Sequence, residues 1–178
     1  MQGPENRGAR AQGLPGEGRK DLKYLRRYGF LLVVAAAVVA ADRLSKRYVE
    51  NRFGVGYGPR QIIDHLLELR VIQNRGAAFG LFQDFTWGLL IVSVAVLAGI
   101  LFYYAWLNER DWPARLGLAL IFGGAISTAY DRGIRGSVID FIQVPYWPIF
   151  NLADSAISIG VVLLVLSTFL RSRRPRPA

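Results

Sequence analysis

Three aspartates lie where long apolar runs of the chain end or begin, and their carboxyl groups could perform acid–base chemistry. Asp42 and Asp131 stand at the ends of two runs, and Asp154 stands near the start of another. If these runs cross a membrane in alternating directions, all three aspartates lie near the same membrane face. Two carboxyl groups held close together cannot both ionise easily, so one can activate water while the other donates a proton. We therefore predict aspartic peptide hydrolysis by Asp131 and Asp154, without a metal or another cofactor.

The positions of this pair on their helices predict which member holds the proton. Asp154 lies in the first turn of its helix, where the macrodipole favours the anion, and Asp131 lies at the end of its helix, where the macrodipole disfavours it. The effect is about 0.3–1 kcal/mol per site, and Arg132 opposes it at Asp131. We expect Asp131 to be the more protonated member of a pair that shares its proton.

Each residue of this pair also has a purely structural interpretation. Asn151 and Asp154 have the spacing of a helix N-cap residue and an acidic residue at the third helical position. Asp131 and Arg132 are placed to form an ion pair at the membrane interface. In isolation, either arrangement is at least as well explained by helix stability as by catalysis.

Other polar residues near the apolar runs have simple structural roles as their default interpretation. Asp42 and Lys46 lie four residues apart, which is the spacing of a salt bridge on one helix face. Asp140 lies in a strand-like loop and is interpreted as structural. His65 is interpreted as a solvated loop residue, and Asn74 as a turn residue.

The composition indicates a membrane protein and excludes several kinds of chemistry. Of the 178 residues, 52% are hydrophobic and 20% are charged, and the charges cluster at the ends and in a few short stretches. The chain has no cysteine, which excludes thiol catalysis and disulfides. Its single histidine, His65, argues against a Ser–His triad and against a zinc site. The net charge of +9 is assigned to Lys and Arg that meet membrane phospholipids, and not to nucleic-acid binding.

Four apolar runs of about 20 residues are long enough to cross a bilayer as helices. They occupy residues 28–48, 85–107, 114–130 and 151–170. Residues 66–72 and 137–144 have the apolar, partly alternating pattern of strands. We therefore predict an all-α membrane protein with four transmembrane helices and strand-forming outer loops.

The chain divides into one membrane domain, residues 28–170, between two basic tails. Residues 1–27 are rich in Gly, Pro, Arg and Gln and are predicted to be disordered, and residues 171–178 form the second tail. Four spans put both tails on one side, and the positive-inside rule places them in the cytoplasm. The arginines of the first outer loop, Arg52, Arg60, Arg70 and Arg75, weigh against this orientation. With cytoplasmic tails, the three aspartates lie near the extracytoplasmic face.

Five short blocks of sequence contain most of these polar residues. They are Asp42-Arg43-Leu44-Ser45-Lys46, Asn74-Arg75-Gly76-Ala77-Ala78-Phe79, Gly123-Gly124-Ala125 followed by Asp131-Arg132, Val138-Ile139-Asp140-Phe141 and Phe150-Asn151-Leu152-Ala153-Asp154-Ser155. Their order and spacing, together with the number of spans, resemble those of lipoprotein signal peptidase (signal peptidase II). The resemblance covers residues 30–170. Each block alone is a weak signal, but five in order are specific.

The resemblance implies an aspartic endopeptidase of the bacterial cytoplasmic (inner) membrane. Such an enzyme removes signal peptides from diacylglyceryl-modified prolipoproteins by cleaving before the lipidated cysteine. Asp131 and Asp154 are implied as the catalytic pair. The supporting and substrate-binding residues carried over are Asp42, Lys46, Asn74, Gly76, Thr128, Arg132 and Asn151.

The resemblance also implies how the outer loops meet a lipidated substrate. A small extracytoplasmic β-cradle and a short amphipathic segment are expected to close over the substrate lipid. The apolar contacts are assigned to Phe79, Leu81, Phe82 and Trp87. Inhibition by the cyclic peptide antibiotic globomycin is implied as well.

One pair of residues departs from the family pattern and leaves alternatives open. The family has Gly-Asn shortly before the first catalytic aspartate, where this chain has Ser127-Thr128. An Asn side chain offers two donors and an acceptor, whereas Thr128 offers a single hydroxyl. One alternative is therefore a weakened relative that binds lipidated prolipoproteins without cutting them. A second alternative, a proton or ion transporter, predicts acids near mid-membrane and inverted repeats, neither of which the sequence has.

Overall fold

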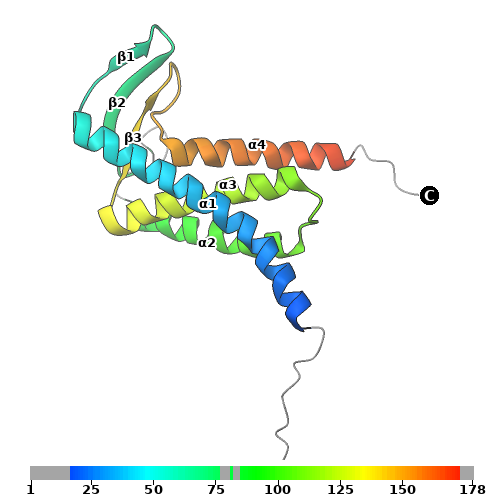
Figure 1. Ribbon diagram of the computed structural model, residues 1–178. Helices are drawn as coiled ribbons and strands as arrows, with labels where there is room; N and C mark the ends of the chain where they lie inside the picture. Colours follow the sequence, from blue (N-terminus) through cyan, green and yellow to red (C-terminus); the bar gives the residue numbers. More distant parts are fainter. Residues whose placement is uncertain (1–16, 77–80, 82–84, 173–178) are drawn as a thin grey trace, which may run out of the picture.

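The computed structural model describes residues 17–76, 81 and 85–172. Within these residues the chain forms four helices and one three-stranded antiparallel sheet. In chain order the elements are α1 (Glu17–Phe53), β1 (Arg60–Ile63), β2 (Leu67–Asn74), α2 (Thr86–Trp106), α3 (Trp112–Arg135), β3 (Val138–Gln143) and α4 (Leu152–Ser172). The helices pack side by side, and the sheet stands at the end of the bundle where α1 ends and α4 begins (Figure 1).

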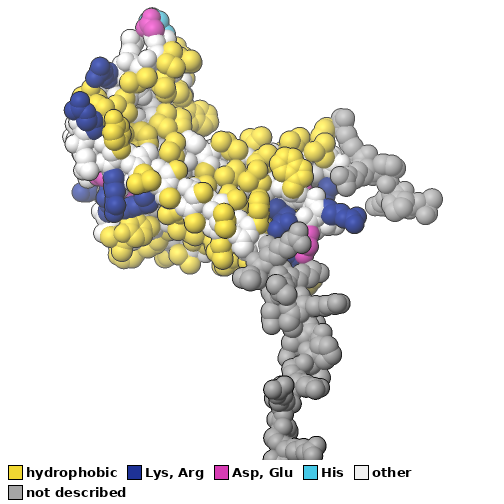
Figure 2. Space-filling model, in the orientation of Figure 1, with side chains coloured by type: hydrophobic (Ala, Val, Ile, Leu, Met, Phe, Trp, Pro, Cys, Tyr) yellow, Lys and Arg dark blue, Asp and Glu magenta, His cyan; other side chains and the backbone are white. Residues whose placement is uncertain are grey.

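Three of the described helices are long and apolar enough to cross a membrane. They are the Arg27–Phe53 part of α1, then α2 and α4, with mean hydropathies of 1.6, 2.3 and 2.0. Apolar side chains cover the helical body, and Lys and Arg side chains gather toward its two ends (Figure 2). The predicted mostly helical fold with a small β-structure is therefore confirmed. A fourth membrane span, at α3, remains a prediction.

Helix α3 is the central helix of the bundle, because it packs against each of the other three helices. Two glycines set its distance from α4. A Cβ atom on Gly117 would lie 2.6 Å from the carbonyl oxygen of Gly160, and a Cβ atom on Gly124 would lie 2.6 Å from that of Ala153. Small residues let helix backbones approach this closely. The contact at Gly124 holds the first turn of α4, which carries Asp154, directly against α3.

The sheet has the strand order β1-β2-β3. The predicted strands at residues 66–72 and 137–144 are confirmed as β2 and β3, and the short exposed strand β1 is an addition to the prediction. Val71 of β2 and Ile139 of β3 pack on Val49 of α1. In the register between β2 and β3, Asn74 lies opposite Val138. The end of β2 is thereby fixed beside the start of β3.

Two helix boundaries differ from the predicted ones. Helix α1 begins at Glu17, so part of the predicted disordered tail is helical, while residues 1–16 and 173–178 lie outside the described residues. Helix α3 continues to Arg135 and ends at Gly136, which has a left-handed φ of 68°. Arg132 and Arg135 in the last turn interact favourably with the helix C-terminus. Asp131 therefore lies within α3 and not at its end.

Candidate active site

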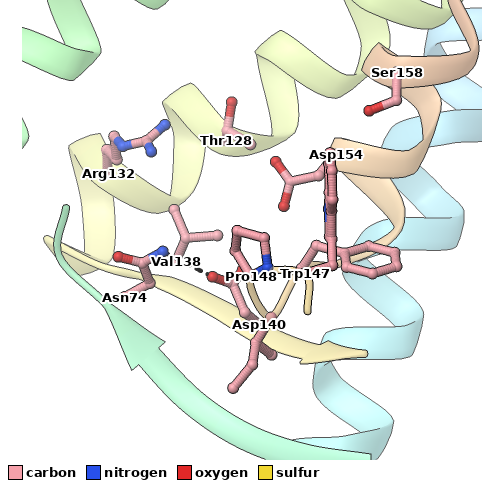
Figure 3. A pocket seen from close by; sticks show the side chains of 11 residues that line it. Asn74, Thr128, Arg132, Val138, Asp140, Trp147, Pro148, Asp154 and Ser158 are labelled. Carbon is pink, nitrogen blue, oxygen red and sulfur yellow. Dashed lines mark hydrogen bonds between the residues drawn. The ribbon is translucent and has the colours of Figure 1, made fainter. Parts of the chain in front are cut away.

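A cavity of about 220 Å³ opens between α3, the start of α4 and the segment that follows β3. Its lining residues are Asn74, Thr128, Arg132, Val138, Asp140, Trp147, Pro148, Ile149, Phe150, Asp154 and Ser158. Two carboxylates are among them, Asp140 from β3 and Asp154 from α4, and both side chains face the cavity (Figure 3). Of the residues predicted from the sequence, four line the cavity: Asn74, Thr128, Arg132 and Asp154.

Asp154 is held in the first turn of α4 by Asn151. The backbone N–H of Asp154 donates to Oδ1 of Asn151 at 3.0 Å, and the backbone N–H of Asn151 donates to Oδ2 of Asp154 at 3.2 Å. This reciprocal arrangement is a capping box, so the structural interpretation of the two residues is confirmed. The cap does not compete with a chemical role, because the same carboxylate faces the cavity.

Asp140 is buried at the junction of sheet and cavity, where two amide side chains hold it. Its Oδ2 accepts from Nδ2 of Asn74 at 2.9 Å, and its Oδ1 accepts from Nδ2 of Asn151 at 2.7 Å. Burial raises the pKa of Asp140 from 3.8 to about 6, and the charge of Asp154 acts in the same direction. The hydrogen bonds from the two amides and the charge of Lys46 lower the pKa. A carboxyl group with a pKa in this range can exchange its proton near neutral pH, as acid–base catalysis requires.

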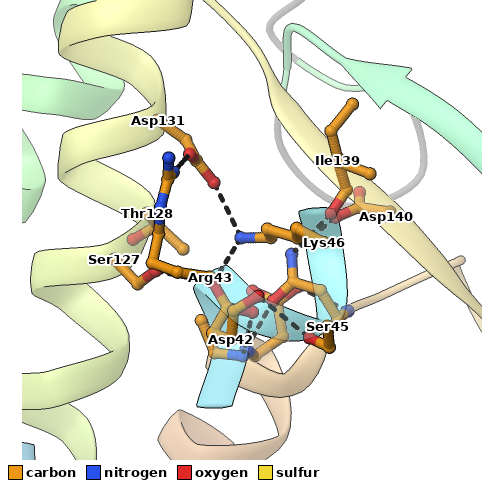
Figure 4. A network of polar contacts seen from close by, with 12 residues as sticks. Asp42, Arg43, Ser45, Lys46, Ser127, Thr128, Asp131, Ile139 and Asp140 are labelled. Carbon is orange, nitrogen blue, oxygen red and sulfur yellow. Dashed lines mark hydrogen bonds and ion pairs between the residues drawn. The ribbon is translucent and has the colours of Figure 1, made fainter. Parts of the chain in front are cut away.

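Asp131 does not line this cavity. Its side chain is fully buried, its Oδ1 pairs with Nη1 of Arg43, and its Oδ2 accepts from Nζ of Lys46 at 2.7 Å (Figure 4). Each carboxylate oxygen thus binds a cation, and neither faces the space that Asp154 faces. Asp131 and Asp154 as a catalytic pair therefore remain a prediction, since only Asp154 lines the described cavity. The expected ion pair between Asp131 and Arg132 is replaced by these two other partners.

Ser127 and Thr128, which are neighbours in sequence, point to different sides of α3. Ser127 and Asp131 lie four residues apart and share the face toward α1, where Ser127 Oγ donates to Oδ2 of Asp42 at 2.6 Å. Thr128 and Arg132 also lie four residues apart and share the face toward the cavity. Thr128 and Asp131 lie three residues apart on the same helix, but only Thr128 lines the cavity, while Asp131 binds Arg43 and Lys46.

Asp42 and Lys46 form the predicted salt bridge and connect three helices. Lys46 Nζ donates to Oδ2 of Asp42 at 2.6 Å and also to Asp131 of α3. The other oxygen of Asp42, Oδ1, accepts from the backbone N–H of Ala153 in α4 at 3.0 Å. Two acids and two cations, with Arg43 as the second cation, balance each other in this buried network. The network fixes the turn of α4 that carries the cavity-lining carboxylate.

The remaining predicted residues shape the cavity wall. Oδ1 of Asn74 accepts from the backbone N–H of Gly76 at 2.9 Å, which confirms the predicted turn, and Arg132 Nη2 donates to the Gly76 carbonyl at 3.3 Å. Nε of Arg132 is buried and has no hydrogen-bond partner within the part of the chain that the structure describes. Thr128 Oγ1 donates to the Ala125 carbonyl of its own helix at 3.2 Å. The Thr128 hydroxyl therefore donates its proton within α3 and not into the cavity.

The apolar residues assigned to substrate contact are only partly described. Phe79 and Phe82 lie outside the described residues. Leu81 and Trp87 are exposed, and neither lines the cavity of Asp154. His65 is exposed as predicted for a solvated loop residue.

Sequence reasoning missed Asp140 and the aromatic wall made by residues 147–150. The signal for Asp140 is a carboxylate between Ile139 and Phe141, inside a strand that is otherwise apolar and buried. A charged group in such a place calls for a partner or a function. For Trp147 and Phe150 the sequence contains no comparable signal, because only the fold of the loop turns them toward the cavity.

Two carboxylates from different elements line one cavity in a protein with three helices long and apolar enough to cross a membrane, an arrangement that suits a membrane aspartic peptidase. Within the described residues, no group of three or more His, Cys, Asp and Glu side chains is placed to hold a metal ion. The family described as signal peptidase (SPase) II matches residues 34–170 of the chain. The chain belongs to this family. The predicted resemblance and enzyme class, an aspartic endopeptidase that removes signal peptides from prolipoproteins, are thereby confirmed.

Individual relatives agree with this assignment. Proteins named lipoprotein signal peptidase in two strains of Desulfitobacterium hafniense are each 37% identical over 145 residues, which cover 81% of this chain and 95% of theirs. Two solved structures of bacterial membrane enzymes have the same fold. The first has a TM-score of 0.77 and 25% sequence identity, and the match covers 84% of this chain and 94% of that one. The second has a TM-score of 0.71 and 27% sequence identity, and the match covers 79% of this chain and 92% of that one.

Proposed function

We propose that this signal peptidase cleaves diacylglyceryl-modified prolipoproteins immediately before the lipidated cysteine, with Asp140 and Asp154 as its catalytic pair. The observation that supports the pair is their common place in the wall of one cavity. Asp131, in contrast, is neutralised by Arg43 and Lys46 away from that cavity. The proposed pair therefore retains Asp154 from the sequence-based pair and replaces Asp131.

The proposed chemistry needs one proton on the pair. The ionised carboxylate takes a proton from water as the water oxygen attacks the carbonyl carbon of the scissile peptide, and the protonated carboxyl gives its proton to the carbonyl oxygen. The C–N bond of the tetrahedral adduct then breaks as the leaving amine takes the proton that came from water, and a hydroxyl of the adduct returns its proton to the other carboxylate, so the pair again holds one proton. The helix N-terminus and the Asn151 N–H favour the anion at Asp154. Burial raises the pKa of Asp140 to about 6, so this residue can hold the proton of the pair near neutral pH. Because only Asp154 has the helix N-terminus beside it, we assign Asp154 as the base and Asp140 as the acid.

The other predicted site residues have two proposed roles. Asn74 and Asn151 orient Asp140 through their amide hydrogen bonds. Arg132 presents its guanidinium at the cavity wall, where the buried Nε has no partner among the described residues and can donate to a substrate carbonyl. The network around Lys46 positions the first turn of α4 and does not touch the substrate.

Substitution of either carboxylate tests the catalytic pair. Asp140→Asn and Asp154→Asn are each expected to reduce cleavage by about a hundredfold or more, because each removes one member of the acid–base pair. A gel-shift assay of a diacylglyceryl prolipoprotein with the purified full chain measures cleavage, which globomycin is expected to block. Asp64→Asn is the matched control, since the side chain of Asp64 is 78% exposed in an outer loop. Wild-type turnover in a variant of the pair would remove that residue from the mechanism.

We also propose an orientation in the bacterial inner membrane. In this orientation α3 is the fourth span, both termini are cytoplasmic, and the sheet and cavity lie at the extracytoplasmic face. The apolar helical body with basic ends supports a membrane-spanning bundle (Figure 2). The chain has no cysteine, so Asp64→Cys and Ser172→Cys each provide a unique label site. A membrane-impermeant maleimide should label the first variant in intact cells and not the second, and the reverse pattern would invert the orientation.

A further inference from the structure

A second cavity, of about 360 Å³, shares Arg132 with the cavity of Asp140 and Asp154. Its wall contains three arginines, Arg75, Arg132 and Arg135, together with Thr86 and Trp87. Among the described residues, no carboxylate lines this second cavity, whereas two line the cavity of Asp154. Arg132 is the one described residue that lines both. The second cavity therefore has the charge of a site for an anion.

Three elements build this cavity where they meet. Oγ1 of Thr86, the first residue of α2, contacts the Arg75 carbonyl at 3.1 Å and the Gly136 carbonyl at 3.4 Å. The end of β2, the start of α2 and the end of α3 are thus joined at one point. The first turn of α2 has no acidic side chain, so the positive end of its helix dipole adds to the potential of the arginines.

The charged side chains that the structure describes around the cavity leave it net positive. Arg135 pairs with Glu50 at 2.8 Å, so one of the three guanidinium groups has a counter-charge beside the cavity. Arg132 is shared with the catalytic cavity, where Asp140 and Asp154 act on it electrostatically. Arg75 is exposed, and the described residues provide no ion-pair partner for its side chain. Arg75 is therefore the cation most available to a ligand.

The position of the cavity along the bundle indicates the kind of anion. Trp87, which is 73% exposed, stands in the first turn of α2, the most apolar of the candidate spans. Exposed Trp side chains at the end of a span favour the level of the lipid headgroups. At this level the abundant anionic group is the phosphodiester of a phospholipid, which Arg binds through charge-assisted hydrogen bonds.

We propose that this three-arginine cavity binds the phosphodiester headgroup of an anionic phospholipid, with its acyl chains along α2. The site lies beside the catalytic cavity and is independent of which carboxylates perform cleavage. Through Arg132, an anion bound here also partly neutralises the guanidinium that faces the catalytic pair. The bound lipid thereby links the composition of the membrane surface to the electrostatics of the active site.

Lipid binding to the purified full chain in neutral detergent tests this proposal by native mass spectrometry. Phosphatidylglycerol is expected to bind about threefold to tenfold more tightly than phosphatidylcholine, because only the former keeps an uncompensated negative charge. Arg75→Gln should abolish most of that preference, and Glu50→Gln should increase it by freeing Arg135. Arg70→Gln is the matched control, since Arg70 is an exposed arginine of β2, five residues before Arg75 and outside the cavity.

Three results would overturn the proposal. Equal affinity for the two lipids would remove the anionic preference. An equal loss in Arg75→Gln and Arg70→Gln would show that only the total surface charge matters. Displacement of phosphatidylglycerol by an equal concentration of soluble glycerol phosphate would assign the site to free phosphate compounds and not to a lipid. If Arg75→Gln fails to fold, Glu50→Gln still tests the proposal, because an unchanged preference for phosphatidylglycerol in that variant would contradict it.

Discussion

Asp131 is paired with two cations, whereas Asp154 lies at a helix N-terminus and faces a cavity. Substitution of Asp131 should therefore lower stability, and substitution of Asp154 should lower turnover. Asp131→Asn leaves Arg43 and Lys46 with one counter-charge fewer in a buried network. Loss of one partner of a buried ion pair costs about 3–5 kcal/mol. We expect Asp131→Asn to lower the thermal unfolding temperature in detergent, while the molecules that remain folded still cleave.

The comparison with Asp154→Asn makes this prediction specific. That variant removes a proposed catalytic group at the cavity and should retain near-wild-type thermal stability while losing turnover. Active-site titration with a tight inhibitor normalises activity to the folded fraction. Full stability of Asp131→Asn together with abolished turnover would return Asp131 to the catalytic pair.

Asp140 gives a pH dependence of stability with a defined sign. Its pKa is raised from 3.8 to about 6 in the folded chain, mainly by burial. Between these values the folded state binds more protons than the unfolded state, so stability decreases as pH rises through this window and is level above it. A shift of about two pH units corresponds to up to about 3 kcal/mol.

Asp140→Asn removes the carboxyl group that titrates, so comparing this variant with wild type tests the predicted pH dependence. Relative to wild type, the Asn variant should become more stable between pH 4 and pH 7, as followed by thermal unfolding in one detergent. The exposed substitution Asp64→Asn should show no such trend, because its carboxylate is solvated in both states. A stability difference that is constant with pH would contradict a raised pKa at Asp140.

At the scale of elements, the two faces of α3 predict two separable phenotypes. Ser127→Ala removes a hydrogen bond to the carboxylate of Asp42 on the α1 face. A hydrogen bond to a charged group contributes about 1.5–3 kcal/mol, so stability should fall with little change in turnover. Thr128→Asn acts on the cavity face, where the native hydroxyl donates to the helix carbonyl of Ala125. An Asn side chain there adds donors, so turnover should stay equal or rise by up to about a hundredfold.

Thermal unfolding and gel-shift kinetics on both variants check this separation. A collapse of turnover in Thr128→Asn would show that the site depends on the hydroxyl. If the wild-type protein is inactive and Thr128→Asn gains cleavage, this result would favour the alternative that the protein binds lipidated prolipoproteins without cutting them. Loss of turnover in Ser127→Ala with unchanged stability would show that both faces contribute to catalysis.

The helices and two of the three strands could be predicted because hydropathy and alternation are local properties of the sequence. The pairing of side chains between elements could not. Asp131 and Asp140 both lie within the family blocks, and only the rotation of α3 and the register of β3 determine that Asp140, and not Asp131, lines the cavity of Asp154. The same local rules did identify the salt bridge of Asp42 with Lys46, since its spacing lies within one helix.

At the scale of the whole molecule, the proposed chemistry lies at one end of the bundle, and the start of α1 and the end of α4 lie toward the other (Figure 1). The cavity walls come from β2, α3, β3, α4 and the segment before α4, while the start of α1 is far from the sheet (Figure 1). The family match likewise begins only at residue 34. We therefore expect that a substrate bound in the cavity does not contact the segment before α1.

Deletion of residues 2–16 should consequently leave the peptidase active. We expect kcat/KM for a diacylglyceryl prolipoprotein in detergent to stay within about twofold of wild type, because the deletion ends before α1 begins at Glu17. In anionic liposomes the same deletion removes Arg7 and Arg10, so a weaker association with the surface is the one change expected there. The measurement compares both settings at equal amounts of folded protein. A large loss of kcat/KM in detergent, with unchanged yield and unfolding temperature, would show that the segment acts on the site directly.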